Sequence, residues 1–312
     1  MKVSINMGSN SVHTGHGYAC MKIISNLGKT NHSLLVDRAA PLEFNFCHPN
    51  FYKFSENTYK VGYTAWESTH IPAGWQEKID EVDEMWAPNK FSKDVFSKFT
   101  DKEIYVFPHG VDETFSIKKR NPGEVLKFLH IGYPAFRKNA HETINTFLQL
   151  YAGRKDVHLT IKGYDGYDFE IEEENITYIK KNMTYSEMLK LMHEHDVLLY
   201  PSWGEGFGLI PLQAMATGMP VVMTDGWCDY KYLAPELIIK SELSYHPWQD
   251  SHPGKMFMPD LDHFAELILK SEKDIDWLTG IQFVRANEVH KKYSWEKVVK
   301  DHFDSVESRL MI

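Results

Sequence analysis

The segment from Tyr200 to Val222 constrains the fold more than any other part of the sequence. It reads Tyr-Pro-Ser-Trp-Gly-Glu-Gly-Phe-Gly-Leu-Ile-Pro-Leu-Gln-Ala-Met-Ala-Thr-Gly-Met-Pro-Val-Val. Its residue types predict a strand, a loop, a helix and a second strand, over residues 197–200, 204–208, 209–217 and 220–223. Gly218 stands just past the predicted helix, where a left-handed residue commonly ends one. This order of elements is typical of an open parallel sheet with crossover helices.

Strands and helices alternate in most of the remaining chain as well. Short apolar runs predict further strands over residues 2–7, 33–36, 59–64, 83–88, 104–108, 127–131 and 158–162. Helical apolar spacing occurs over residues 18–27, 139–151, 186–195 and 294–310. Residues 116–123 are charged and contain Pro and Gly, which predicts a linker. We therefore predict an α/β protein with two doubly wound, Rossmann-like domains, residues 1–115 and 116–293.

Composition and charge narrow the class of protein. Hydrophobic residues make up 43% of the 312 residues, and no apolar run reaches the roughly 18–20 residues that span a bilayer, so we expect no integral membrane association. The N-terminal strand runs into a polar loop and does not resemble a signal peptide. The three cysteines lie far apart without metal-ligand spacing, which predicts a reducing, cytoplasmic location. A net charge of −9 weighs against a dedicated nucleic-acid binder.

The loop and helix of the central segment predict a binding site for a diphosphate. In an open parallel sheet, ligands bind beyond the carboxyl ends of the strands, where this loop would lie. Gly206 and Gly208 are expected to let the backbone approach a ligand closely. The helix that follows directs its free N–H groups and its positive dipole end at the same place. Glu205 offers a carboxylate that only accepts hydrogen bonds, which suits sugar hydroxyls.

This segment resembles the signature of the large retaining family of GT-B glycosyltransferases known as family four, or glycosyl transferases group 1. Members carry Glu-Gly-Phe-Gly, a second Glu eight residues after the first, and Ala-Met-Ala-x-Gly-x-Pro-Val. The motif assigns donor binding to the residues that match it here, namely Gly206, Phe207, Gly208, Leu209 and Gln213. Gln213 replaces the second glutamate, which typically holds the ribose hydroxyls. Because a Gln carbonyl still accepts hydrogen bonds, we expect ribose binding to persist in altered form.

Two further stretches resemble family motifs around the donor phosphates. Residues 132–138 resemble Gly-Arg-x-x-x-x-Lys, with Gly132 matched and Tyr133 in place of the Arg. Arg137 and Lys138 are therefore the cations expected to meet the two phosphates. Gly15-His16-Gly17 resembles the N-terminal glycine loop that abuts the donor phosphate in the family.

Three other stretches resemble the family outside the phosphate site. Residues 108–115 resemble the Pro-Asn-Gly-Val-Asp-x-x-Phe of the domain junction, with His109 at the Asn position, and His109 is expected from this match to contribute to donor binding. Residues 293–295 resemble the Phe-Ser-Trp that opens the last helix, which crosses back to the first domain in GT-B proteins. The resemblance thus assigns residues 294–312 to that domain, with a cleft between the two. Glu67 lies near the place where other members have an active-site histidine, and is a candidate for touching donor sugar or acceptor.

The resemblance implies a hexosyl- or pentosyltransferase that uses a nucleoside-diphosphate sugar, such as a UDP-sugar, with retention of configuration. Its catalytic residues would be Glu205, Lys138, Arg137 and Glu67, and no metal or other cofactor is expected. The pairs Asp260/Asp262 and Asp274/Asp276 are interpreted as helix starts and not as a metal motif.

The acceptor expected from the resemblance is a saccharide or glycoconjugate. One alternative is a hydroxymethylated base in viral DNA, which would place the protein in a host cytoplasm. Another is a protein that binds nucleotide sugar without catalysis, supported by the departures at Tyr133 and Gln213. The base, the sugar and the oligomeric state do not follow from the sequence.

Overall fold

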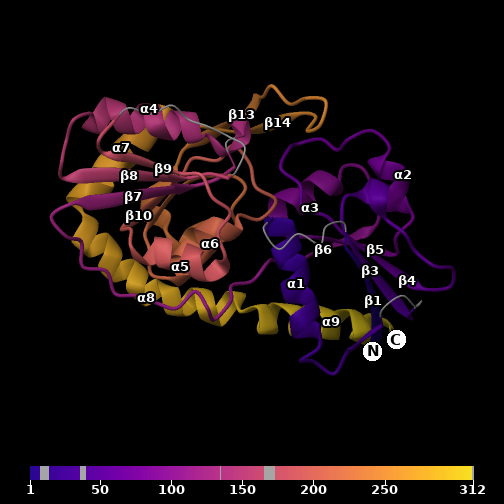
Figure 1. The fold of residues 1–312 in the computed structure, drawn as a ribbon. Coiled ribbons are helices and arrows are strands. Elements are labelled where there is room, and N and C mark those ends of the chain that lie inside the picture. The colour runs from indigo at the N-terminus through magenta and orange to yellow at the C-terminus, as the bar shows by residue number, and fades with distance from the viewer. Residues whose placement is uncertain (8–13, 36–39, 134, 165–172, 311–312) are drawn as a thin grey trace.

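The computed structural model describes residues 1–7, 14–35, 40–133, 135–164 and 173–310. Within these ranges the chain forms two α/β lobes that lie side by side (Figure 1). Each lobe is built on a six-stranded sheet whose neighbouring strands are all parallel. The strands predicted from the sequence all occur, with ends shifted by no more than two residues. The predicted α/β class with two doubly wound domains is confirmed.

The sheet of the first lobe has the strand order β2-β1-β3-β4-β5-β6. Its strands are β1 (Lys2–Met7), β2 (Ser33–Leu35), β3 (Leu42–Phe46), β4 (Tyr59–Tyr63), β5 (Glu84–Ala87) and β6 (Glu103–Val106). Its helices are α1 (Gly15–Leu27), α2 (Trp75–Asp80) and α3 (Lys90–Phe96). Sequence reasoning missed β3, whose apolar residues alternate with Glu43 and Asn45. Both polar side chains are buried because they accept hydrogen bonds from the backbone N–H groups of Ser55 and Lys53.

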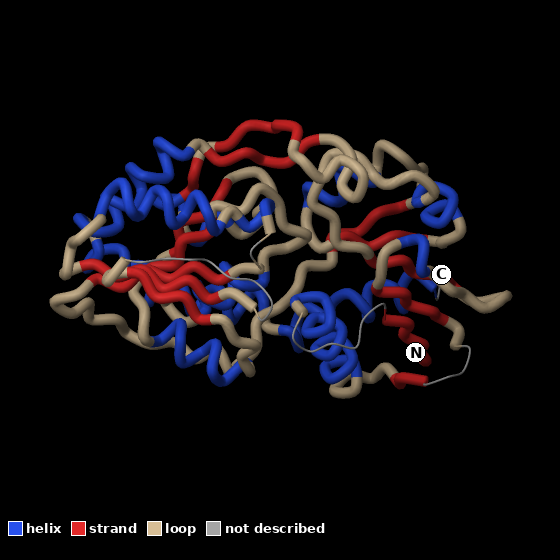
Figure 2. The backbone as a smooth tube through the Cα atoms, turned by 45° about the horizontal axis from the view of Figure 1, so that its top comes forward, coloured by secondary structure: helices blue, strands red, loops and turns tan. Residues whose placement is uncertain are grey.

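The sheet of the second lobe has the order β12-β11-β10-β7-β8-β9. Its strands are β7 (Leu126–Ile131), β8 (Val157–Lys162), β9 (Ile176–Ile179), β10 (Val197–Tyr200), β11 (Val221–Thr224) and β12 (Ile238–Ile239). Its helices are α4 (Ala140–Tyr151), α5 (Tyr185–His193), α6 (Leu209–Ala216), α7 (Leu261–Lys273) and α8 (Ile275–Tyr293). An antiparallel hairpin of β13 (Ser241–Tyr245) and β14 (Lys255–Pro259) extends from this lobe over the other, as Figure 2 shows from a second angle.

Each sheet buries apolar side chains on both faces, as parallel sheets require. In the second lobe α5 and α6 cover one face, and α4 and α7 cover the other. Asp260 and Asp274 are the N-cap residues of α7 and α8, which confirms that both Asp pairs stand at helix starts. None of the described helices is long and apolar enough to cross a bilayer.

The last helix, α9 (Trp295–Leu310), returns to the first lobe and packs on α1 (Figure 1). Its buried face joins the first-lobe core through Trp295, Val298, Val299, Phe303 and Val306. The two chain crossings between the lobes run together, since the Val111 N–H donates to the Tyr293 carbonyl at 2.6 Å. A Cβ on Gly110 would lie 2.8 Å from the Trp295 Cα, so this crossing requires glycine. The predicted return of the C-terminal helix is confirmed.

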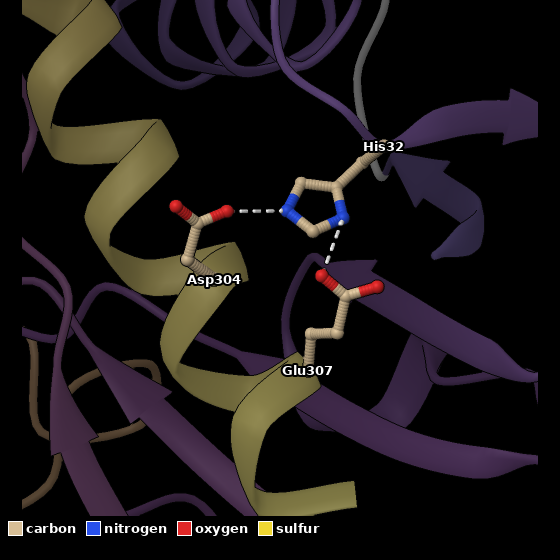
Figure 3. A group of neighbouring side chains, drawn as sticks. All are labelled: His32, Asp304 and Glu307. Carbon is tan, nitrogen blue, oxygen red and sulfur yellow. Dashed lines mark hydrogen bonds and ion pairs between the residues drawn. The ribbon is translucent and has the colours of Figure 1, made fainter. Parts of the chain in front are cut away.

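His32 ties α9 to the first lobe at its far end (Figure 3). Its Nε2 lies 2.9 Å from an Asp304 oxygen, and its Nδ1 lies 3.9 Å from a Glu307 oxygen. The two carboxylates face opposite ring nitrogens, as Figure 3 shows. This geometry suits an imidazole held between two acceptors better than a metal ion chelated by three ligands at one point.

The predicted linker, residues 116–123, connects the lobes but is anchored on the second one. Arg120 is 5% exposed and donates to the carbonyls of Met192, His195 and Thr217. It also donates to the Thr217 hydroxyl at 2.9 Å. The charged composition with Pro and Gly predicts a loop. Only the tertiary structure shows that Arg120 is buried and that its guanidinium is hydrogen-bonded to the second lobe.

Candidate active site

A cleft of about 920 Å³ lies between the two lobes, and both contribute to its walls. Every residue that the sequence predicted for the site lines this cleft, except Gly17. The first lobe contributes Gly15, His16, Glu67 and His109, and the second contributes Gly132, Arg137, Lys138, Glu205, Gly206, Phe207, Gly208, Leu209 and Gln213. The carboxyl ends of β3, β7, β8 and β10 lead into it, which is where an open parallel sheet binds ligands.

Glu205 is the centre of a buried ionic cluster in this cleft. Its carboxylate accepts from the Lys138 ammonium at 2.6 and 2.8 Å, and one oxygen lies 3.3 Å from the Arg137 guanidinium. The hydroxyls of Tyr200 and Ser202 donate to the same oxygen at 3.0 and 2.6 Å. Glu205 is 6% exposed, so water supplies little of its solvation and these donors replace it.

Glu67 completes the cluster from the first lobe. One of its oxygens lies 3.4 Å from Arg137, which also donates to the Gly204 carbonyl in the signature loop. Two carboxylates therefore balance two cations, with Arg137 between Glu67 and Glu205. The four side chains predicted to be catalytic are thus in contact with one another, although they come from three separate stretches of the chain.

The pKa shifts in the cluster follow from burial and pairing. Burial opposes ionisation of Glu67, but Arg137 and His252 outweigh it and lower the pKa of this carboxyl to about 2. Burial likewise opposes ionisation of Glu205, and Lys138 and Arg137 lower its pKa below the ordinary value. Burial also opposes the charge of Arg137, yet Glu67 and Glu205 raise the pKa of its guanidinium. Burial lowers the pKa of the Lys138 ammonium below its ordinary value, and Glu205 opposes that shift. The two carboxylates and Arg137 are therefore ionised at neutral pH.

Two helix N-termini converge on the cleft beside this cluster. Helix α1 begins at Gly15 and α6 begins at Leu209, and both residues line the cleft. They are neighbours across the two lobes, since a Cβ on Gly15 would lie 3.6 Å from a Leu209 methyl carbon. Free N–H groups and positive dipole ends favour an anion there.

The N-terminal glycine stretch differs from its prediction. Residues 15–17 form the first turn of α1 and not a loop, with Thr14 as N-cap accepting from the Gly17 N–H at 3.0 Å. Gly17 is buried in this turn and is not among the residues that line the cleft. Residues 8–13, the rest of the predicted loop, lie outside the described part of the chain.

The structure gives a different reason for two glycines of the signature loop. Gly206 and Gly208 were expected to allow close approach of a ligand. A Cβ on Gly206 would lie 2.6 Å from the Ala65 Cβ of the first lobe. Gly208 has a left-handed φ of 85°, and its Cβ would lie 2.6 Å from Trp227 and from the Tyr230 hydroxyl. Both glycines are thus required by protein neighbours, and Gly206 by the seam between the lobes.

Two histidines face the cleft in the neutral form. Burial and the nearby His16 lower the pKa of His109 to about 3, and both of its ring nitrogens are buried without a hydrogen-bond partner among the described residues. Burial and then His48 lower the pKa of His16, whose Nε2 is likewise unpartnered. Neutral imidazoles with a free nitrogen can donate or accept, which suits a hydroxyl-bearing ligand.

Gln213 lies about one turn into α6, is 2% exposed, and lies close to the Tyr18 hydroxyl of the first lobe. Sequence reasoning missed Lys162, Tyr164 and Tyr185, which line the same end of the cleft. Lys162 is buried at the carboxyl end of β8, with its ammonium 3.5 Å from the centre of the Tyr164 ring. Its position in the sequence could have indicated it, because Lys162 is the last residue of a predicted strand and ligands bind at the carboxyl ends of such strands.

Comparison with known proteins agrees with this geometry. Residues 126–241 match the sequence model of the family described as Glycosyl transferases group 1. Glycogen synthase of Mycobacterium tuberculosis is 26% identical over 156 residues, which cover 47% of this chain and 35% of that protein. O-antigen chain mannosyltransferase RfbU of Salmonella typhimurium is 27% identical over 182 residues, covering 55% and 50%. The chain matches half or less of the length of these relatives.

Solved structures match the chain over nearly its whole length. Sucrose-phosphate synthase from Thermosynechococcus elongatus superposes with a TM-score of 0.70 at 10% identity, covering 99% of this chain and 98% of the other. WaaG, a glycosyltransferase involved in lipopolysaccharide biosynthesis, superposes with a TM-score of 0.64 at 13% identity, covering 97% and 99%. Likeness at such low identity establishes the fold and not the activity.

The two parallel-sheet lobes, the cleft between them and the returning helix define a protein of the GT-B class. Within its second lobe, residues 126–241 are similar in sequence to the glycosyl transferases group 1 family. The resemblance of the segment Tyr200–Val222 to glycosyl transferases group 1 is confirmed by this match, which includes the segment.

Proposed function

We propose that this protein transfers a sugar from a nucleoside-diphosphate sugar to an acceptor hydroxyl, with retention of configuration and without a metal ion. The observation that carries the proposal is the ionic cluster of Arg137, Lys138, Glu205 and Glu67 at the point where α1 and α6 begin. Two cations and two helix N-termini favour a diphosphate, and two carboxylates suit the hydroxyls of a sugar beside it.

The reaction breaks the bond between the sugar and the diphosphate, so negative charge grows on the leaving oxygen. Arg137 and Lys138 would stabilise that charge in a site from which water is largely removed, where such contacts are strongest. Glu205 and Glu67 neutralise the same cations when no phosphate is present, and would turn to the sugar hydroxyls on exchange. The leaving diphosphate would accept the acceptor proton on the same face, which gives retention.

The first-lobe wall of the cleft favours a neutral acceptor. The described residues that line it include His16, Phe46, His48, Phe51 and Glu67, and none is Lys or Arg. Phe51 is 58% exposed and offers an apolar face at the rim. A DNA acceptor would gain from cations at this wall. We therefore favour a saccharide or glycoconjugate over a hydroxymethylated base in DNA.

The proposal is tested by a thermal-shift screen against UDP, GDP, ADP and their sugars, with and without EDTA. A nucleotide present at about 100 times its Kd adds about 2.7 kcal/mol of stability, which raises the Tm of a chain of this length by about 4 °C. Sugar released or transferred from the bound donor is then followed by NMR, which also reports the anomeric configuration. A nucleotide that binds without any hydrolysis or transfer would favour the non-catalytic alternative. No shift with any nucleotide would refute the proposed donor site.

A further inference from the structure

The hairpin of β13 and β14 belongs to the second lobe but is fastened to the first. The Thr69 N–H donates to the Lys255 carbonyl at 3.0 Å, and the Lys255 N–H donates to the Thr69 hydroxyl at 2.9 Å. The Phe257 ring packs edge-on against Phe91 at 4.9 Å. These contacts fix the segment between the two hairpin strands beside the Trp66–Thr69 stretch, at the edge of the cleft.

His252 lies in this segment and contacts the first lobe through the face of its ring and through its Nε2. The imidazole stacks on Trp66 with ring centres 4.8 Å apart and planes within 6°. Its Nε2 lies 3.3 Å from a Glu67 oxygen. Trp66 is 1% exposed and donates its indole N–H to the His70 carbonyl at 2.7 Å, so the surface under His252 is itself fixed.

Both oxygens of Glu67 therefore contact side chains of the second lobe. One oxygen faces His252 and the other faces Arg137, at 3.3 and 3.4 Å. A carboxylate held at both oxygens by groups on two different segments has a defined orientation. Its side chain remains 17% exposed and lines the cleft, so its orientation is fixed while it stays accessible to a ligand in the cleft.

We propose that His252 is a positioning residue of the active site, which sets the orientation of Glu67 toward the substrates through its ring stack and its N–H. The inference rests on the proposed function for its catalytic consequence, but not for the placement of Glu67 itself. In this way the β13–β14 hairpin, which lies outside the signature motifs, determines the orientation of the Glu67 carboxylate in the cleft.

Two substitutions at His252 separate the ring stack on Trp66 from the contact with Glu67. His252→Phe keeps a flat ring on Trp66 and removes the donor to Glu67, whereas His252→Gln keeps a donor and removes the stacked ring. His158→Phe is the matched control, because His158 is a half-buried histidine on β8 outside the cleft lining. The hairpin keeps its contacts through Thr69 and Phe91 in every variant, so the fold is expected to survive, which circular dichroism checks.

The kinetic arm measures donor hydrolysis and transfer with the nucleotide sugar found by the screen. We expect His252→Phe to lower kcat by about tenfold or more with the donor KM within about twofold, since a misplaced reacting group can cost about 100-fold. His252→Gln should recover part of the loss. In a Glu67→Gln background His252→Phe should have no further effect, because the group that it positions is gone. Equal losses in both backgrounds would overturn the inference.

The structural arm does not depend on activity. A crystal structure of the His252→Phe protein should show the Glu67 carboxylate rotated away from its present place, with Trp66 unmoved. If Glu67 keeps its orientation without the imidazole, the inference is wrong even if the protein is a transferase. If Glu67 moves but no donor is turned over by the native protein, the positioning stands and the proposed function fails.

Discussion

Lys138→Met is the substitution that tests the donor site most directly. Methionine keeps much of the length and the apolar stem of lysine but removes its charge. In the native protein the Lys138 ammonium binds both Glu205 oxygens, at 2.6 and 2.8 Å, and the Tyr200 hydroxyl at 2.9 Å. The variant leaves Glu205 buried with Arg137, Tyr200 and Ser202 as its remaining partners.

The expected cost in stability is about 2–3 kcal/mol. Removing one partner of a buried ion pair typically costs about 3–5 kcal/mol, because a buried charge is left uncompensated. Here the Arg137 guanidinium at 3.3 Å and the Ser202 hydroxyl at 2.6 Å still stabilise the carboxylate, which places the loss at the lower end or below. Urea denaturation at neutral pH measures it.

The expected cost in activity is about 100- to 1000-fold in kcat, the loss typical for removing one donor that stabilises developing negative charge. Sugar transfer or donor hydrolysis is followed by nucleotide release. Lys190→Met is the control, since Lys190 is 77% exposed and its pairing with Glu194 at 3.8 Å should add little. A Lys138→Met protein that transfers sugar at the native rate would refute the phosphate assignment. A variant as stable as the native protein would refute the account of the Glu205 pair.

Three further predictions concern the cluster, the linker and the seam between the lobes. The pKa of Glu67 lies at about 2 against an ordinary 4.5, so its ionisation contributes up to about 3 kcal/mol to the free energy of unfolding. This contribution is present above about pH 4.5 and is lost as the pH falls toward 2. Urea denaturation at a series of pH values should show a weaker pH dependence in this range for Glu67→Gln, and an unchanged pH dependence would contradict the account. Arg120→Met should cost about 3 kcal/mol in the same assay because it leaves buried carbonyls without donors, and a loss below about 1 kcal/mol would count against that. Gly206→Ala should cost about 1–3 kcal/mol by overlap with Ala65, and combining it with Ala65→Gly should restore most of the stability; failure to restore would locate the strain elsewhere.

The sequence predicted most of the strands and helices because their signals are local. Apolar periodicity, glycines and caps act within a turn or two, so β10, α6 and β11 were found with ends shifted by at most one residue. Elements with weak local signals were missed. In β3, Glu43 and Asn45 are buried only because a later loop donates hydrogen bonds to them.

By itself, the sequence predicted the second-lobe side of the candidate site, which we propose binds the donor. The segment Tyr200–Val222 carries its loop, its helix N-terminus and Glu205 within 23 successive residues, so residue pattern and motif suffice there. What Glu205 binds was not determined in this way, since Lys138 and Arg137 stand in a different motif. Their pairing depends on two strands of one sheet delivering them to the same edge.

Only the tertiary structure decided how the two lobes share the cleft. It placed Glu67 against Arg137, His252 against Glu67, and Ala65 against Gly206. Each of these contacts joins residues at least 70 positions apart, and no periodicity or cap predicts which side chains will meet across an interface. The physical reason is that ion-pair partners and close backbone contacts are selected by the docking of whole domains, which depends on every packed surface at once.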